Sequence, residues 1–436
     1  MSITRREFVR STVLAVAAAQ LTRDLNAASE TPAPAKIKTP VKPGVASVHW
    51  LDDAVPSIAP GTTWGTPWPQ GRHAAQTGFA LRTAKGESVP VQSWPLAYWP
   101  DGSLKWTGHA IPANEFLTPD FGLSAGTPAM PAQSLAVKET SDALEIDTGV
   151  IRATVAKSGR KIIPSIKRGD TEIMRDGQLV MWRSDSPERE ATPEKFEGEI
   201  NSVTLESSGA VRAVVKITGQ HASTTGSRKW LPFVVRLYFY AGGEVVRVLH
   251  TIIYNGDPKK DAISGLGIRF SVPMRGALYD RHVRFSGQEK GLFAEAVRGI
   301  TGLRRDPGAE VKAAQLAGRA TPPLDTWART VSSRLQYIPA FADWTLFQPN
   351  CDGFEIRKRT REGFTWLGSA RGSRAGGLGY VGTPQGGAAF GLRNFWQGNP
   401  AQLDIRNATG DVAEITTWLW APDPGAVDLR SYHDEI

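Results

Sequence analysis

Short runs of β-branched and aromatic residues, separated by clusters of glycine and proline, are the feature that most constrains the fold of this chain. The 436 residues include 44 glycines and 30 prolines, which favours many turns over long helices. The clearest case is a hairpin, in which residues 233–240 and 244–254 are two strand-like runs joined by residues 241–243. Only two short segments, 292–297 and 309–317, have a helix-like pattern. The sequence therefore predicts an all-β protein.

The strand-like runs form two groups along the chain. We expect a small β-barrel over residues 45–137 and a large antiparallel β-sandwich over residues 138–436, since a chain of this length needs more than one core. In the first group, residues 62–71 are expected to form a rigid loop carrying Trp64 and Trp68. Residues 79–83 and 89–94 are expected to be strands, and residues 100–102 (Pro-Asp-Gly) a tight turn.

The N-terminal residues are typical of an export signal. Arg5 and Arg6 precede an uncharged, mostly apolar run at 11–19, which is too short to cross a bilayer because a spanning helix needs about 20 apolar residues. Residues 1–28 therefore resemble a twin-arginine signal peptide, and residues 29–44 a Pro-rich linker. An amphipathic helix on the membrane surface is the alternative. We expect the twin-arginine machinery to deliver a soluble protein, without membrane attachment, to the periplasm or beyond.

The charge pattern limits the class of partner. The chain carries a net charge of +8, and no block of like charges of the kind found in nucleic-acid-binding arms is present. We therefore expect no nucleic acid partner. A mildly basic surface suits an acidic polysaccharide or oligosaccharide, although solubility explains it equally well.

No motif in the sequence indicates a cofactor. Cys351 is the only cysteine, which excludes an intrachain disulfide and a zinc site built from several cysteines. The seven histidines are scattered, so no metal site is expected, and a calcium requirement stays open. Residues 377–382 match G-x-G-x-x-G, but a Pro- and Gly-containing segment follows instead of a helix, so we expect no dinucleotide site.

Several segments, in order along the chain, resemble the exo-rhamnogalacturonan lyase family. Residues 65–71 (GTPWPQG), 89–93 (VPVQS) and 97–106 (AYWPDGSLKW) resemble its N-terminal barrel. Residues 250–270, 353–360, 394–397, 418–422 and 428–432 resemble its central β-sandwich. The resemblance implies a RIFT-type barrel, a β-sandwich and a lyase origin. Members of that family continue into an α/α-toroid, which this sequence lacks, so we expect the 436 residues alone to be a poor lyase.

The resemblance implies a specific chemistry. A polyuronide lyase removes the proton next to a uronate carboxylate, so it needs a cation beside the carboxylate, a base and a proton donor. Arginine suits the first role because its planar fork binds a carboxylate bidentately. Arg357 and Arg359 alternate along a probable strand, which places them on one face roughly 6.5–7 Å apart. A solvated strand face on which Glu355 balances the charge is the alternative.

Five further residues are weaker candidates. Arg304 and Arg305 could bind an acidic substrate or simply lie in a solvated loop. Trp396 and Gln397 could stack on and hydrogen-bond to a sugar, although Trp396 could equally be a core residue. His282 is the candidate base, with a structural histidine as the alternative.

The sequence thus leaves three functions open. The first is an exported polyuronide lyase of the rhamnogalacturonan type, or its β-rich N-terminal portion, acting by β-elimination at a uronate. The second is a non-catalytic carbohydrate-binding or accessory protein derived from such a lyase. A structural protein of the envelope is the third.

Overall fold

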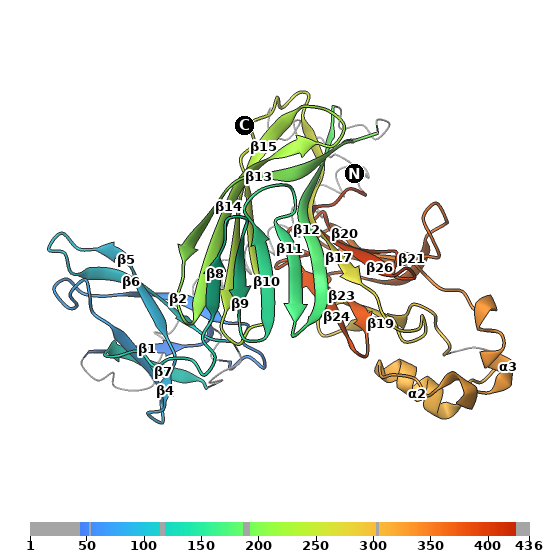
Figure 1. Cartoon of the computed structure of the whole chain (residues 1–436), viewed down its shortest axis with the longest axis horizontal. Coiled ribbons are helices and arrows are strands. Elements are labelled where there is room, and N and C mark those ends of the chain that lie inside the picture. Colours follow the sequence, from blue (N-terminus) through green and yellow to red (C-terminus); the bar gives the residue numbers. More distant parts are fainter. Residues whose placement is uncertain (1–43, 52–53, 114–117, 186–191, 302–304, 424–436) are drawn as a thin grey trace, which may run out of the picture.

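The structure, a computed structural model, describes residues 44–51, 54–113, 118–185, 192–301 and 305–423. It confirms the predicted all-β fold, a small N-terminal barrel followed by a large antiparallel sandwich. Figure 1 shows the barrel at one end of an elongated molecule, the sandwich in the centre and a short helical segment at the other end. The predicted signal peptide, with Arg5 and Arg6, and most of the predicted linker lie outside the described residues.

Two small sheets make the barrel, with strand orders β1-β7-β3-β4 and β2-β6-β5. The strands are β1 (Val45–His49), β2 (Thr62–Pro67), β3 (Phe79–Thr83), β4 (Ser88–Val89), β5 (Gln92–Tyr98), β6 (Leu104–Ile111) and β7 (Asp120–Ala125). The expectation of a loop over residues 62–71 was wrong in its first part, because residues 62–67 pair with β6 along their whole length. Trp68 is buried and stacks on Phe79 with 5.2 Å between the ring centroids.

The sandwich is built mainly from one 15-stranded sheet. Its main path runs β16-β15-β14-β13-β12-β17-β26-β25-β20-β21-β22, and β8 to β11 branch from β12. A second, four-stranded sheet has the order β19-β18-β23-β24. The strands are β8 (Ala136–Glu139), β9 (Ala143–Asp147), β10 (Ile151–Ala156), β11 (Ile163–Arg168), β12 (Thr171–Ser184), β13 (Glu194–Ser207), β14 (Arg212–Ser223), β15 (Lys229–Tyr240), β16 (Arg247–Ile252), β17 (Ala262–Pro273), β18 (His282–Ser286), β19 (Leu292–Ala296), β20 (Asp343–Asn350), β21 (Gly353–Arg359), β22 (Leu367–Gly372), β23 (Leu378–Thr383), β24 (Gly386–Gly391), β25 (Ala401–Arg406) and β26 (Val412–Trp420).

The large sheet has two hydrophobic cores because different parts of it are covered by different partners. Strands β9 to β11 pack against β14 and β15 around residues such as Ile146, Val215 and Phe233. The part made of β20, β21, β25 and β26 packs one face on the four-stranded sheet, around residues such as Trp344 and Phe285. The opposite face of those four strands is therefore free to carry polar side chains.

Among the described residues, helices are confined to one segment. They are α2 (Ala309–Ala317), η2 (Leu324–Thr326), α3 (Arg329–Ser332) and η3 (Leu335–Tyr337), where η is a 3₁₀ helix. The predicted helix at 309–317 is confirmed. The predicted helix at 292–297 was wrong, since residues 292–296 form β19 and pair with β18. A run this short has no helical stability of its own, so pairing with a neighbouring strand decides its conformation.

The barrel is attached to the sandwich by hydrogen bonds. The Gln92 Oε1 atom of β5 accepts backbone N–H groups of Val211 (3.2 Å) and Arg212 (2.8 Å) at the start of β14. The hydroxyls of Thr63 and Tyr240 lie 2.8 Å apart. The barrel sheet β2-β6-β5 therefore lies beside strands β14 and β15 of the large sheet.

Candidate functional site

Polar side chains, among them the buried Thr345 and Asp404, line the face of four neighbouring strands of the large sheet that is turned away from the four-stranded sheet. Alternation fixes this arrangement: Trp344, Leu346, Ile356 and Ile405 point into the core, so the residues between them point outward. The strand register then places the outward residues in rows. Thr345 of β20 lies between Asp404 of β25 and Arg357 of β21, and Asp343 lies beside Arg359.

Three arginines from two of these strands converge on one tryptophan. The guanidinium carbons of Arg357, Arg359 and Arg406 lie 4.9, 4.5 and 5.2 Å from the centroid of a Trp366 ring. Trp366 precedes β22 and is half-buried. We call these four residues the arginine cluster. Cation–π contacts of this length stabilise the arrangement and hold the guanidinium groups on one side of the sheet.

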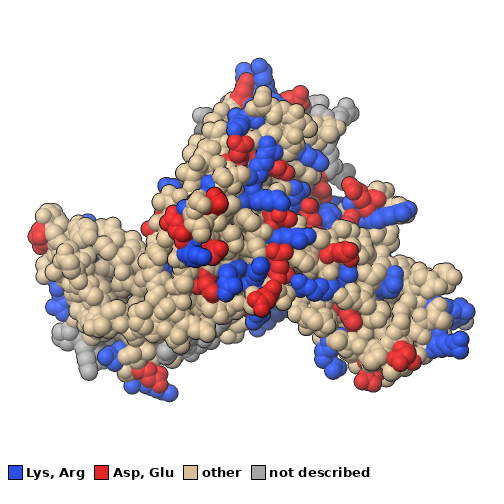
Figure 2. Space-filling model, viewed as in Figure 1, with Lys and Arg blue, Asp and Glu red and all other residues tan. Residues whose placement is uncertain are grey.

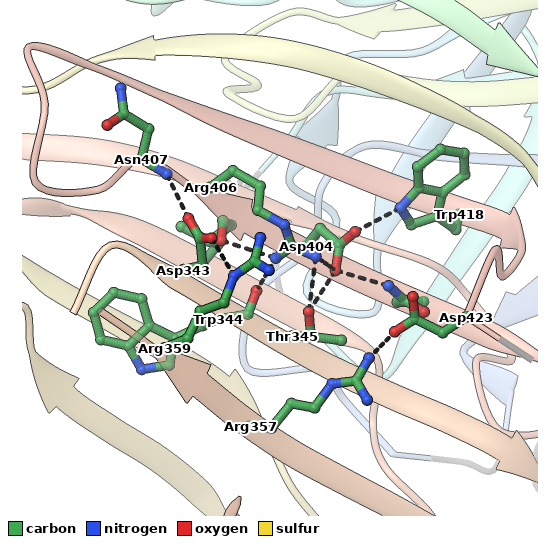
Figure 3. Close-up of polar contacts among 12 residues, drawn as sticks. Asp343, Trp344, Thr345, Arg357, Arg359, Asp404, Arg406, Asn407, Trp418 and Asp423 are labelled. Atoms are coloured by element: carbon green, nitrogen blue, oxygen red, sulfur yellow. Dashed lines mark hydrogen bonds and ion pairs between the residues drawn. The ribbon is translucent and has the colours of Figure 1, made fainter. Parts of the chain in front are cut away.

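Each arginine of the cluster also has a carboxylate partner (Figure 3). Arg357 pairs with Asp423, the Nε atom of Arg359 lies 2.6 Å from Asp343, and Arg406 lies 2.8 Å from Asp404. The three cations thus face three anions. Burial lowers the pKa of Arg357, and its Nε atom is buried without a hydrogen-bond partner among the described residues.

Asp404 is the most densely bonded carboxylate of this face. Its Oδ1 atom accepts from the Thr345 hydroxyl (2.7 Å) and the Gln402 amide (2.9 Å), and its Oδ2 atom accepts from the Trp418 indole N–H (2.8 Å). These hydrogen bonds link β20, β25 and β26 to Asp404, which also pairs with Arg406. Asp404 therefore stabilises this face of the sheet. Its lone pairs are occupied, so it is a positioning group and not a free base.

Glu414 has the most perturbed carboxyl group of this face. It lies on β26 opposite Arg406 of β25, and Arg269 of β17 is 3.4 Å away. Burial raises the pKa of Glu414 although Arg269 and Arg406 oppose the shift. A carboxyl group with a raised pKa keeps its proton to a higher pH than an ordinary glutamate, which is a property of groups that transfer protons.

Ion pairs continue from this face across the centre of the sheet. Arg269 lies 3.7 Å from Glu197 of β13, which in turn lies 3.3 Å from Arg160. Figure 2 shows the same mixture on the visible surface, where blue and red side chains alternate over the central sheet. Charges of one sign therefore do not dominate this surface, and a local cluster is needed to select an acidic ligand.

The structure brings together two of the residues predicted to bind substrate. Arg357 and Arg359 share one face, since both contact Trp366 and the intervening Lys358 pairs with Glu295 of β19 on the other side. Glu355 lies 3.6 Å from Arg371, and its charge also opposes the lowering of the Arg357 pKa, so a strand face on which Glu355 balances the charge stays an alternative. A role for the two arginines in binding substrate stays a prediction.

The remaining predicted residues lie elsewhere. Arg304 is outside the described residues, and its neighbour Arg305 is exposed. Trp396 is half-buried between β24 and β25 with Arg374 4.5 Å from its ring centroid, and Gln397 is exposed. These residues do not contact the arginine cluster in the part of the chain that the structure describes.

His282 has the surroundings of a structural histidine. It is buried at the start of β18, and its two ring nitrogens lie 3.0 Å from the backbone carbonyl oxygens of Asp280 and Gln315. The Nε2 contact with Gln315 joins β18 to α2, whereas the Nδ1 contact with Asp280 is local to the start of the strand. A general base needs a nitrogen that can reach the substrate, so this geometry favours the structural alternative.

Sequence reasoning missed two residues of the arginine cluster, Trp366 and Arg406. It also missed the three carboxylates that pair with the arginines, which are Asp343, Asp404 and Asp423. A partial signal was present in residues 402–406 (Gln-Leu-Asp-Ile-Arg), whose polar and apolar residues alternate as in a half-buried strand. That pattern places Asp404 and Arg406 on one face of β25. It does not reveal that β20 and β21 are the neighbouring strands.

No group of three or more His, Cys, Asp and Glu side chains in the described ranges is arranged to hold a metal ion. None of the helices in those ranges is long and apolar enough to cross a membrane.

Comparison with known proteins adds to this geometry. Residues 44–126 match the family model described as the PcRGLX-like N-terminal RIFT barrel domain, and residues 135–436 match the PcRGLX-like protein central beta sandwich domain. The chain is 35% identical over 390 residues to the uncharacterized protein YetA of Bacillus subtilis (strain 168). The alignment covers 88% of this chain and 45% of YetA, so the chain spans less than half the length of this relative.

Proposed function

The chain belongs to the rhamnogalacturonan lyase-related PcRGLX-like family, and from this premise we propose that it is the β-rich portion of an exported polyuronide lyase. The site that we assign to the substrate is the face with the arginine cluster. One observation carries the assignment, which is that three guanidinium groups from two strands converge on a half-buried tryptophan. The paired arginines at Arg5 and Arg6 support export.

The cluster suits the first requirement of β-elimination, the neutralisation of a uronate carboxylate. A guanidinium has five N–H donors, so Arg357 can keep Asp423 and still donate to a ligand. Trp366 offers an apolar surface for a sugar ring beside these donors. Binding of the carboxylate lowers the pKa of the carbon acid next to it, which is the purpose of this group in a lyase.

Glu414 is the candidate for proton transfer on the same face. In the elimination, a base takes the proton from the carbon next to the carboxylate, a carbon–carbon double bond forms, and the bond to the glycosidic oxygen breaks as that oxygen gains a proton. The raised pKa of Glu414 suits it to carry one of these protons. The matching acid or base would come from another residue or from a further part of the protein.

Binding of a rhamnogalacturonan oligosaccharide to the full chain tests the proposal. We expect Arg357→Gln to weaken binding about 10- to 100-fold, because a charge-assisted hydrogen bond contributes about 1.5–3 kcal/mol. The same oligosaccharide with its carboxyl groups reduced should bind the parent protein and Arg357→Gln with equal affinity. Arg371→Gln, at an exposed arginine of the adjacent strand β22, is the matched control. Equal affinities of Arg357→Gln and the control would refute the assignment of the site.

A second function fits the same site without chemistry, namely a carbohydrate-binding accessory protein. The observation that favours it is the complete pairing of the three arginines, which is what a rigid binding surface needs. Formation of ultraviolet-absorbing unsaturated product separates the two functions. A lyase should form this product and lose turnover in Glu414→Gln without losing binding, whereas an accessory protein should bind the oligosaccharide and leave it intact.

A further inference from the structure

An exposed apolar strip covers the outer face of the barrel sheet β2-β6-β5. Thr107 and His109 of β6 are buried toward the barrel core, where the Trp68 indole N–H donates to the Thr107 hydroxyl at 2.8 Å, so Trp106 and Gly108 point to the outer face. Trp106 is 41% exposed and Leu96 of β5 is 57% exposed. Figure 2 shows mostly uncharged atoms on the visible side of the barrel, at the left of the view.

Two glycines form the floor of this strip. Gly65 of β2 and Gly108 of β6 are directly opposite in the register. A Cβ atom on Gly65 would lie 3.6 Å from the Trp106 ring and 3.8 Å from Leu96. A Cβ atom on Gly108 would lie 2.4 Å from the Trp94 ring, so only glycine lets this indole lie over the strand. Leu96, Trp106 and Trp94 therefore form one continuous surface, which we call the barrel strip.

A buried arginine that has no hydrogen bond to a carboxylate among the described residues lies at the sandwich end of the barrel strip. The Arg212 guanidinium carbon is 4.4 Å from the Trp94 ring centroid and 5.4 Å from that of Tyr238. The residue is only 8% exposed, yet its Nε and Nη1 atoms have no hydrogen-bond partner among the described residues. The nearby Glu206 carboxylate is taken by Arg236 through two bonds of 2.7 and 2.9 Å.

Arg281 shows how the same fold treats a buried arginine with a structural role. It is 7% exposed, and its guanidinium donates to the backbone carbonyls of Gly276, Ala408 and Gly410 at 3.1, 3.0 and 2.6 Å. A buried cation without such partners is unfavourable for folding. Arg212 thus has cation–π contacts with Trp94 and Tyr238 but lacks the hydrogen bonds that Arg281 has, and an anion beside it would supply them.

We propose that the barrel strip and Arg212 form a second glycan site, which binds a sugar ring on Trp106 and Leu96 and a uronate carboxylate at Arg212. The acidic glycan as ligand class rests on the proposed function, but the residues are different from those of the arginine cluster. Arg247, with its guanidinium 5.4 Å from the Tyr238 ring centroid, adds a second positive charge at this end. A second site on the barrel would bind another part of the same polymer, at a distance from the arginine cluster on the sandwich.

The experiment measures binding of a rhamnogalacturonan oligosaccharide, and of its carboxyl-reduced form, to the full chain by calorimetry. We expect Arg212→Gln to weaken binding of the acidic oligosaccharide at least tenfold and to leave the melting temperature unchanged or raised. Trp106→Ala should weaken binding of both forms. Tyr337→Ala, which removes another exposed ring, and Arg281→Gln, which removes a fully bonded buried arginine, are the controls. The first should bind normally, and the second should melt at a lower temperature.

The outcomes separate this inference from the proposed function. If Arg212→Gln loses one binding site and Arg357→Gln loses a different one, the inference and the proposed function are both supported. Loss in Arg357→Gln alone overturns the second site and leaves the proposed function intact, whereas loss in Arg212→Gln alone does the reverse. A lower melting temperature for Arg212→Gln with unchanged binding would show that the arginine is structural. A change of oligomeric state in Trp106→Ala with unchanged binding would make the strip an interface between copies, and either result would overturn the inference.

Discussion

Replacing Asp404 with alanine tests whether the outward face of the sandwich is held by its buried carboxylate. The Asp404 side chain is 8% exposed and accepts from Thr345, Gln402 and Trp418 as well as pairing with Arg406 at 2.8 Å. The substitution removes all four interactions. It also leaves the Arg406 guanidinium with only backbone carbonyls and the Thr345 hydroxyl as described partners.

The expected cost follows from these contacts. Removing one member of a buried ion pair costs about 3–5 kcal/mol of unfolding free energy, since the remaining charge is left uncompensated. The Arg406 side chain is 24% exposed, so water recovers a part of this, and the lower end of the range applies. Asp352 pairs with Arg374 at 3.0 Å but is 67% exposed, so Asp352→Ala should cost less than about 1 kcal/mol.

Urea unfolding at neutral pH, followed by circular dichroism, measures both variants. A loss of about 3 kcal/mol should lower the transition midpoint by about 1–3 M, given a slope of about 1–3 kcal/mol per molar urea. The Asp352→Ala midpoint should lie close to that of the parent protein. If the two variants unfold at the same urea concentration, the carboxylate does not hold the sheet face and the reasoning fails.

Two further predictions concern pH and export. Burial lowers the pKa of His109 from 6.5 to about 4, so the folded state binds fewer protons than the unfolded state between these values. The stability from neutral His109 should be complete above pH 6.5 and fall by up to about 1.4 kcal/mol per pH unit as the pH drops toward 4. Melting temperatures across this range should decline less steeply in His109→Gln, and an equal decline would contradict the assignment. Changing Arg5 and Arg6 to lysine should leave unprocessed precursor in the cytoplasm on fractionation, and normal processing would argue against the twin-arginine signal.

Local sequence patterns were sufficient for the fold class. Hydrophobic alternation and turn residues indicate strands and turns within a window of a few residues. The hairpin of β15 and β16, the turn at Gly102 and helix α2 were therefore all predicted. The errors came from segments with weak local preference. Residues 62–67 and 292–296 became strands because β6 and β18 lie beside them in space.

The candidate site could be predicted only in part. Alternation placed Arg357 and Arg359 on one face, because side chains on a strand repeat every two residues. Their carboxylate partners, Asp343 and Asp423, lie 16 and 66 residues away in the sequence, and no local rule links them. His282 shows the same limit, since the carbonyl of Gln315 that its ring contacts lies 33 residues away in the sequence.

The sequence by itself thus determined the all-β fold class, which side chains share a face of a predicted strand, and which family motifs are present. Only the tertiary structure decided which strands are neighbours, and hence that Arg406 joins Arg357 and Arg359 around Trp366. It also decided that Arg212 is buried beside Trp94, with no hydrogen-bond partner for its Nε and Nη1 atoms among the described residues. The physical reason is that hydrophobic alternation is a property of one strand, whereas register and burial are set by the strands and sheets that pack against it.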